Sequence, residues 1–283
     1  MGLSMTAFGV FARSFPVGTA DEVAEAIAAS GFDCTQLNLS VIGRPTLDEE
    51  LDDPSATEIR DSFSRTGVRI WGVSGTFNAA HPDPTVRAAG VRACQALIRR
   101  APALGSNAVT LCTGTRDVEN MWRSHPDNTT AEAWADLVEV LGALIPVAEA
   151  AGVQLGIEPE SGNVVRDAAA ARRLLTETFP GTTALSIVLD PANLLSMPTL
   201  DDQECILGEA FELLSDRVAC LHAKDVVRSG YSAPGVGGLD YDLVMRLHGQ
   251  LAHDVPIIAQ DLTADDAGRV CRFLKDAWMK AHP

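Results

Sequence analysis

An alternation of short apolar runs and longer helix-like segments constrains the fold of this chain more than any other feature. Eight runs rich in apolar or β-branched residues recur, and each precedes an Ala-, Leu- and Glu-rich segment with helical spacing, as "VQLGIE" precedes "DAAAARRLLTETF". The expected strands end near residues 12, 39, 74, 112, 158, 190, 222 and 260. Eight such units in 283 residues predict a single (β/α)8 TIM barrel over residues 1–283, with a doubly wound open sheet as the alternative.

Candidate caps delimit several of the expected helices. Ser, Thr and Asp side chains favour the N-terminus of a helix, and Gly favours the position just past its end. We therefore expect helices to begin after Thr19, Asp83 and Thr263, and helices to end at Gly31, Gly67, Gly105 and Gly152.

Composition excludes several classes of partner. The chain carries 22 Lys and Arg against 38 Asp and Glu, and a net charge of -16 opposes binding to nucleic acid or to anionic membranes. No run approaches the roughly 18 apolar residues of a membrane span. The six cysteines form no CxxC pair, which is typical of a reduced, cytoplasmic protein. We expect a small-molecule ligand and leave a homo-oligomer open; residues 1–5, "MGLSM", with a second Met, are expected to be a frayed end or an addition to the natural chain.

Four consecutive expected strands end in residues that can bind a metal ion. These are Glu158 in "GIEPE", Asp190 in "IVLDPANL", His222 in "CLHAKD" and Gln260 in "VPIIAQDL". Glu158, Asp190 and His222 each have an ordinary structural explanation, as a loop carboxylate, a turn cap and a core histidine, and Gln260 is either a working ligand or substrate contact or the relic of a ligand. Strand ends of a barrel share one face, however, and neighbouring strands lie about 4.8 Å apart, so the four side chains can converge on one ion. Four polar groups buried at the same level also require a shared partner.

The donor set indicates which ions the site would take and what it would do. Glu158 and Asp190 bring two negative charges, whereas His222 and Gln260 bring none. Mixed oxygen and nitrogen ligands suit Mn²⁺ or Mg²⁺, with Co²⁺, Zn²⁺ and Fe²⁺ also compatible. A divalent ion stabilises the charge that develops when a proton leaves a carbon next to a carbonyl. Glu158 is the candidate base for that proton.

The motifs resemble a known superfamily. "GIEPE", "LDPANL", "LHAKDV", "GVGGLDY" and "PIIAQD" are similar, in order and spacing, to those of the xylose-isomerase-like sugar isomerases and epimerases, which also include inosose dehydratases, ketose 3-epimerases and endonuclease IV. The resemblance implies a divalent metal held by Glu, Asp, His and Glu at the ends of strands five to eight. Glu158, Asp190 and His222 match, and Gln260 stands where the last Glu is expected. In the epimerases both glutamates move protons, which an amide cannot do.

Further residues are candidates for the substrate pocket. The resemblance implies substrate contacts for Asn193, where many relatives carry His, and for Arg228, although a loop amide and a solvated charge are the plain alternatives. His81 is expected either to line the pocket or to precede a capped helix at the surface. The segment 113–129 is long for a connection, and its Trp122 suggests a lid over the site, with an exposed loop as the alternative.

The remaining polar residues near the motifs are expected to have supporting roles. Lys224 and Asp225 are expected to order ligands or loops rather than to act in catalysis. By strand alternation we expect Glu160 to face away from Glu158, and Asp261 to face the helices.

Three functions follow as hypotheses. The first is a divalent-metal-dependent sugar isomerase or epimerase that acts on a small ketose or cyclic keto-polyol. The second is a metal-dependent lyase or dehydratase, which needs only one base and which Gln260 favours. The third is a non-catalytic sugar-binding protein with a decayed metal site. The barrel fold alone does not choose among them.

Overall fold

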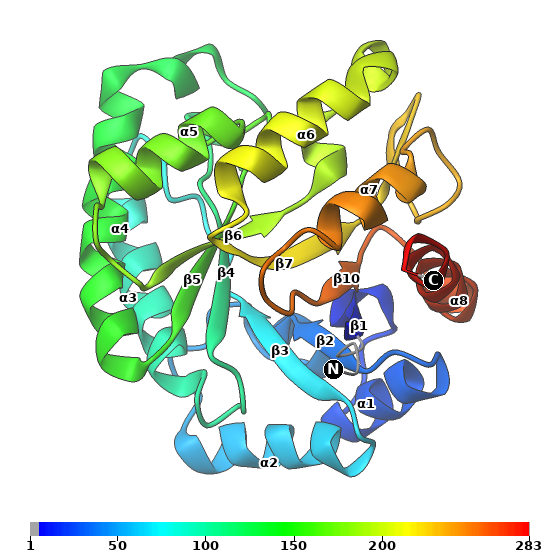
Figure 1. Cartoon of the computed structure of the whole chain (residues 1–283). Helices are drawn as coiled ribbons and strands as arrows, with labels where there is room; N and C mark the ends of the chain where they lie inside the picture. The colour runs from blue at the N-terminus through cyan, green and yellow to red at the C-terminus, as the bar shows by residue number, and fades with distance from the viewer. Residues whose placement is uncertain (1–5, 283) are drawn as a thin grey trace.

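Eight parallel strands close into a ring, because the last strand pairs with the first (Figure 1). The computed structural model describes residues 6–282. The order around the ring is β1-β10-β7-β6-β5-β4-β3-β2, and closure pairs Phe8 with Ile257. The predicted (β/α)8 barrel is therefore confirmed, and the open sheet is wrong. What we expected of residues 1–5 lies outside the described residues.

The elements follow the alternation of the sequence. The barrel strands are β1 (Phe8–Phe11), β2 (Cys34–Leu37), β3 (Arg69–Ser74), β4 (Ala108–Cys112), β5 (Gln154–Glu158), β6 (Leu185–Leu189), β7 (Val218–Ala223) and β10 (Ile257–Ala259). The helices are α1 (Ala20–Ala29), α2 (Asp53–Arg65), α3 (Pro84–Arg100), α4 (Ala131–Ala151), α5 (Ala168–Arg173), α6 (Gln203–Leu214), α7 (Tyr241–His248) and α8 (Ala264–Ala281). Each expected strand end lies within two residues of the observed one.

Short elements extend several of the connections. They are the 3-10 turns η1 (Ala12–Ser14), η2 (Leu39–Ile42), η3 (Pro126–Thr129), η5 (Pro191–Leu194) and η6 (Met197–Asp202), the π-helical turn η4 (Leu174–Thr178), and a two-stranded antiparallel hairpin of β8 (Asp225–Val227) and β9 (Gly230–Ser232). The hairpin follows β7 directly, so it stands at the carboxyl end of the barrel.

The predicted N-terminal caps are confirmed, whereas α3 ends at Arg100 rather than at Gly105. Thr19 forms a capping box with Glu22, and the side chains of Asp83 and Thr263 accept hydrogen bonds from the first turns of α3 and α8. Gly152 ends α4 with φ 66°, a left-handed conformation that glycine adopts without strain.

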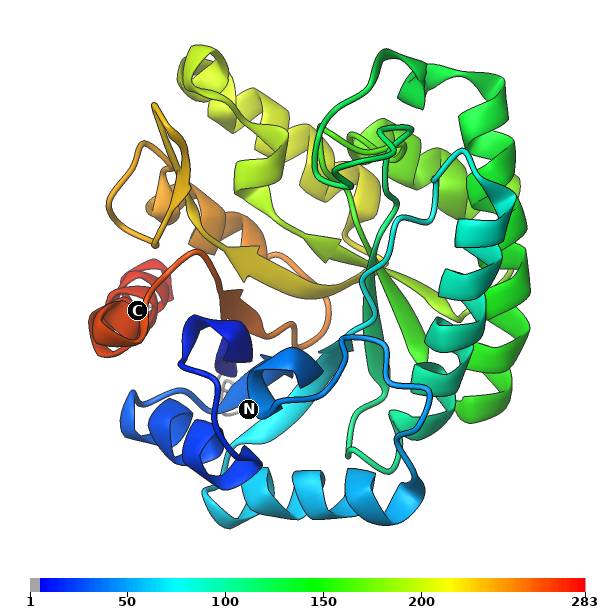
Figure 2. The ribbon, with the colours of Figure 1, turned by 180° about the vertical axis from the view of Figure 1, so that it is seen from behind.

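Two apolar layers hold the barrel. The larger lies between the strands and the surrounding helices, which form the outer ring in Figures 1 and 2. The smaller contains Phe11, Val188, Cys220 and Ile258, with Trp71 packed against it. Because β1 and β6 are not neighbours in the ring, this cluster fills the barrel interior and leaves the carboxyl ends of the strands as the open face. Among the described helices, none has the length and apolarity needed to cross a membrane.

Candidate metal and active site

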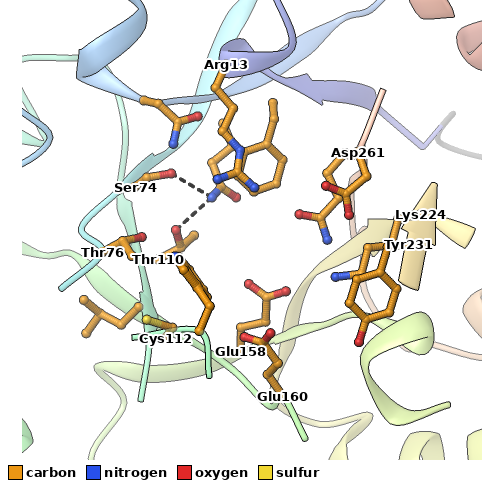
Figure 3. Close-up of a pocket in the computed structure, with 16 residues that line it drawn as sticks. Arg13, Ser74, Thr76, Thr110, Cys112, Glu158, Glu160, Lys224, Tyr231 and Asp261 are labelled. Atoms are coloured by element: carbon orange, nitrogen blue, oxygen red, sulfur yellow. Dashed lines mark hydrogen bonds between the residues drawn. The ribbon is translucent and has the colours of Figure 1, made fainter. Parts of the chain in front are cut away.

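A polar cavity of about 400 Å³ opens at the carboxyl ends of the strands (Figure 3). Residues at or after the ends of most barrel strands line it, so the loops of distant sequence segments meet there. Its lining includes Arg13, Gln36, Asn38, Ser74, Thr110, Trp122, Glu158, Glu160, Lys224, Tyr231, Gln260 and Asp261. In a barrel of this kind this is the face that carries function.

Three of the predicted metal ligands converge beside this cavity, and Glu158 is the one that lines it. One potential ligand atom from each of Glu158, Asp190 and His222 lies within 4.8 Å of the other two. The side chains of Asp190 and His222 are fully buried, and that of Glu158 is 19% exposed. Asp190 also caps η5, because its Oδ1 accepts a hydrogen bond from the Ala192 N–H at 2.9 Å. The turn cap and the candidate ligand are therefore the same residue.

A glutamine on the far side of the ring fixes the orientation of His222. The Gln36 amide nitrogen donates to Ser74 Oγ and Thr110 Oγ1, both at 2.9 Å. Its Oε1 is therefore an acceptor, and it lies 2.9 Å from His222 Nε2. That contact is a hydrogen bond only if Nε2 carries the proton. The neutral imidazole then presents the lone pair of Nδ1 toward Glu158.

Glu158 and His222 are placed to hold a cation between Oε1 and Nδ1. His222 Nδ1 lies 3.2 Å from Glu158 Oε1, so a neutral imidazole would set its lone pair against a carboxylate oxygen. A proton or a metal ion on Nδ1 removes that repulsion. Burial opposes ionisation of Glu158, but His222, Lys224 and a hydrogen bond from Asn193 Nδ2 (2.9 Å) outweigh it and lower the pKa of the carboxyl to about 2. Glu158 is thus held as a carboxylate.

Asp190 is compensated by two nitrogen donors. Lys224 Nζ lies 3.1 Å from Asp190 Oδ2, and the Gln260 amide nitrogen donates to the same oxygen. Lys224 also donates to Asn193 Oδ1 at 2.7 Å and covers the ring of Tyr231. Burial opposes the charge of Lys224, yet the carboxylates of Asp190 and Glu158 raise the pKa of its ammonium above the ordinary value. The site therefore already holds one fixed positive charge beside the candidate ligands.

The residues present fit a divalent ion. Glu158 and Asp190 supply two anionic oxygens, and the tautomer set by Gln36 supplies a nitrogen lone pair, which is a donor set suited to Mn²⁺ or a similar ion. The Gln260 side chain can offer either its NH₂ or its carbonyl oxygen by a half-turn of the amide. The ammonium of Lys224 opposes a second cation and would lower the affinity of the site without removing any ligand atom.

Two expectations about carboxylates are wrong. Glu160 was expected to face away from Glu158, but both line the cavity: alternation puts residues two apart on the same face, and Glu160 already lies past the end of β5 at Glu158. Asp261 was expected to face the helices, but it lines the cavity as well (Figure 3). β10 ends at Ala259, and Asp261 has φ 56°, so strand alternation no longer applies to it.

These two carboxylates are harder to ionise than usual. Burial, followed by the charge of Glu158, raises the pKa of Glu160 to about 7. Burial also raises the pKa of Asp261, although Lys224 and Arg13 act in the opposite direction. The cavity thus combines a fixed carboxylate, Glu158, with two that take up protons more readily.

The other predicted site residues divide between the cavity and the surface. Asn193 is buried between Glu158 and Lys224, and Trp122 lies on the cavity rim, 49% exposed. Arg228 is exposed near the turn of the β8–β9 hairpin, and the cavity lining contains Tyr231 of that hairpin instead. His81 accepts a hydrogen bond from the Asp83 N–H and is not part of the lining.

The supporting segments are ordered by internal hydrogen bonds. Asp225 accepts from the N–H groups of Val226, Gly235 and Leu239, which fits the loop-ordering role expected of it. In the segment 113–129, Asn128 Oδ1 accepts from the Thr115 hydroxyl and the Arg116 N–H. The ends of this segment are therefore fixed, and Trp122 is the part of it that reaches the cavity.

Sequence reasoning missed the polar residues of the first half of the barrel. Gln36, Ser74 and Thr110 stand inside runs that read as apolar strands, and Asn38 follows one of them. The signal that could have identified them is a polar residue at the end of a buried strand, which also marked Glu158. Asn38 Oδ1 is buried, has no hydrogen-bond partner among the described residues, and belongs to the cavity lining.

Comparison with known proteins places the chain in a family. No curated protein matches it in sequence. The solved structures that are similar to it include the 3-keto-D-glucoside 4-epimerase of E. coli (16% identity, 96% of this chain and 100% of that chain, TM-score 0.76) and an L-ribulose 3-epimerase (15%, 98% and 96%, 0.77). A D-psicose 3-epimerase determined in the presence of D-fructose is also similar (18%, 96% and 99%, 0.73). At these identities the likeness establishes the fold. Residues 24–258 match the profile of the xylose isomerase-like TIM barrel family, and the chain therefore belongs to that family.

Proposed function

We propose that this protein is a divalent-metal-dependent epimerase or isomerase of a small keto-sugar or cyclic keto-polyol. The observation that carries the proposal is the convergence of Glu158, Asp190 and His222 beside a polar cavity that Glu158 lines, with the imidazole oriented by Gln36. The similar structures named as sugar epimerases support the same class of substrate.

The cavity suits a polyol. Its lining offers amides, hydroxyls and carboxylates that can form hydrogen bonds with the hydroxyl groups of a sugar. Trp122 and Tyr231 at the rim supply apolar faces for the carbon skeleton. A volume of about 400 Å³ lies within the usual range for small-molecule sites.

Glu158 is the group that removes the proton. Its lowered pKa shows that it stays ionised despite its buried surroundings, and it is 19% exposed at the cavity, so it can reach a substrate carbon. When bound, a divalent ion on Glu158, Asp190 and His222, with Gln260 as a fourth ligand, would polarise the substrate carbonyl and stabilise the negative charge left by the proton. Asn193 holds the Glu158 carboxylate by a hydrogen bond and so fixes the direction from which it attacks.

One observation favours a dehydratase as the second candidate. The Gln260 amide bonds to Asp190, at the position where a second proton-transferring glutamate is expected from the family resemblance. A dehydration needs one base and an acid for the departing hydroxyl, so it tolerates this change.

The test joins metal analysis with a substrate screen. Purified wild type, Asp190→Ala and His222→Ala are compared by elemental analysis, with the exposed Asp201→Ala as a matched control. We expect about one ion per chain in wild type and control, and strongly reduced metal in the two ligand variants. Equal metal content in all four proteins would contradict the site.

In the screen, keto-sugars and inososes are incubated with the wild-type protein and Mn²⁺, and the products are identified by NMR. Epimers or isomers support the proposal, and loss of water from the substrate supports the dehydratase. Glu158→Gln should lower kcat by about 10²-fold or more at saturating metal. A metal-free, inactive wild type would point to a sugar-binding protein with a decayed site.

A further inference from the structure

We propose that Asp261 is the second proton-transfer residue of the site and takes the role that Gln260 cannot fill. The inference rests on the proposed function, because it assigns the second half of an epimerisation. It comes from the backbone at the end of β10, from the position of Asp261 in the cavity, and from the bonds that already occupy the neighbouring groups.

The backbone turns Asp261 into the cavity. Asp261 is the one residue other than glycine with a positive φ in the described part of the chain, at 56°. Such a conformation is uncommon for a residue with a side chain, and it is found disproportionately at functional sites. Its effect here is to carry an aspartate that follows a buried strand toward the cavity, beside Lys224 (Figure 3).

Glu158 and Asp261 approach the cavity from different sides. β5 and β10 are three strands apart in the ring, with β6 and β7 between them, and Figure 3 shows the two carboxylates at separate walls. A flat enediolate held between two walls has one face toward each. A proton can then leave from the side of Glu158 and return from the side of Asp261.

Epimerisation requires one proton to leave the substrate carbon and another to return to it. Glu158 takes the proton of the carbon next to the carbonyl, and the electron pair of that C–H bond passes to the carbonyl oxygen. A protonated Asp261 gives its proton to the same carbon from the other face, a new C–H bond forms, and the carbonyl returns. Glu158 leaves the cycle protonated and Asp261 ionised, and exchange with water restores both, because the Glu158 side chain is 19% exposed and Asp261 keeps contact with solvent although its carboxyl is partly desolvated.

The other polar groups are less free to act. Glu160 follows the same strand as Glu158, and its Oε2 accepts a hydrogen bond from Asn163 Nδ2 at 3.2 Å. Lys224 is engaged by Asp190 and Asn193, and Gln260 by Asp190. No described side chain forms a hydrogen bond or ion pair with the Asp261 carboxylate in this structure. Asp261 is therefore the carboxylate at this wall that can reach a substrate.

Deuterium exchange separates the two proton-transfer steps. The probe is the epimeric pair that the screen identifies, beginning with D-fructose and D-psicose, in D₂O with Mn²⁺. Asp261→Asn is the informative variant, because Asn accepts a positive φ as readily as Asp and keeps the shape of the side chain. Asp254→Asn, the same change at an exposed position on the other end of the barrel, is the matched control.

The expected pattern is specific to a two-residue proton transfer. Asp261→Asn should lower epimerisation by about 10²-fold or more. It should still exchange the proton of the epimer whose C–H faces Glu158, and it should keep wild-type metal content by elemental analysis. Glu158→Gln should show the opposite preference, exchanging the other epimer. Asp254→Asn should behave as wild type in every measurement.

Several results would overturn the assignment. If Asp261→Asn epimerises at nearly the wild-type rate, Asp261 is a bystander. If deuterium exchange and product formation fall together in this variant, Asp261 binds substrate. If the variant loses metal, Asp261 is a ligand. A wild type that binds metal but neither exchanges nor converts any keto-sugar refutes the proposed function itself, which is a different outcome from a wild-type epimerase that does not need Asp261.

Discussion

Replacement of Gln36 tests whether the first half of the barrel controls the metal affinity of the second half. Gln36 is buried, donates to Ser74 and Thr110, and accepts from His222 Nε2–H, in three contacts of 2.9 Å. Gln36→Leu removes all three at nearly constant volume. The fully buried imidazole then has an N–H without an acceptor and is free to take the other tautomer, which places a proton on Nδ1.

The size of the effect follows from these contacts. An orphaned buried donor costs about 1–3 kcal/mol, and each lost neutral hydrogen bond contributes about 1 kcal/mol, so we expect Gln36→Leu to lower the free energy of unfolding by about 3 kcal/mol. Loss of the partner that orients a metal-binding histidine typically lowers metal affinity by about 10- to 100-fold. Urea unfolding in EDTA measures the first quantity, and titration calorimetry with Mn²⁺ measures the second.

Gln36→Glu is the matched control. Its carboxylate still accepts from His222 Nε2–H, and the hydroxyls of Ser74 and Thr110 can rotate to donate to it. Metal affinity should therefore remain at or above the wild-type value, even if the buried charge costs stability. Equal losses of affinity in Gln36→Leu and Gln36→Glu, or no loss in either, would refute the reasoning.

Three further predictions concern the cavity walls. Lys224→Met should cost about 3–5 kcal/mol of stability in EDTA, because Asp190 loses its buried partner, and Mn²⁺ should restore much of it; equal urea midpoints for variant and wild type in EDTA would contradict this. The pKa of Glu160 is raised from 4.5 to about 7, so the folded state binds the Glu160 proton more tightly than the unfolded state does. Wild type therefore loses stability as the pH rises from 4.5 to about 7. Glu160→Gln should remove that loss, which urea unfolding at pH 4 and pH 8 would reveal as a stability gain over wild type at pH 8 only. Trp122→Ala should raise KM several-fold with little change in kcat, since the ring is a rim contact, and steady-state kinetics that show a large fall in kcat would refute this role.

The regular part of the fold was predictable from the sequence, and the irregular part of the site was not. Periodic apolar runs determine strands and their ends, and this is why the amino-acid sequence alone places Glu158, Asp190 and His222 together. The orientation of Asp261 could not be predicted in this way, because a positive φ at an aspartate leaves no pattern in neighbouring residues. The turn of the β8–β9 hairpin likewise decides that Tyr231, rather than Arg228, reaches the cavity.

Polar residues inside strands were missed for another reason. A single Gln or Thr in an apolar run is compatible with either face of a strand, and only the assembled ring shows that Gln36 and Thr110 meet. Their partner His222 is 186 residues away from Gln36 in the chain. Contacts at such separation depend on closure of the barrel and carry no local signal.

The hydrogen bond between Gln36 and His222 means that the second half of the chain supplies the candidate ligands and the first half supplies the residue that orients one of them. A fragment that begins at α4 contains every candidate ligand, from Glu158 to Gln260, yet lacks the residue that selects the tautomer of its histidine. Such a half-barrel would bind Mn²⁺ poorly, and mixing it with the complementary piece, 1–130, would recover tight binding only as the two join. Metal affinity would then report on assembly of the ring. Measured during refolding, it would show when β2 and β7 reach their final positions relative to each other.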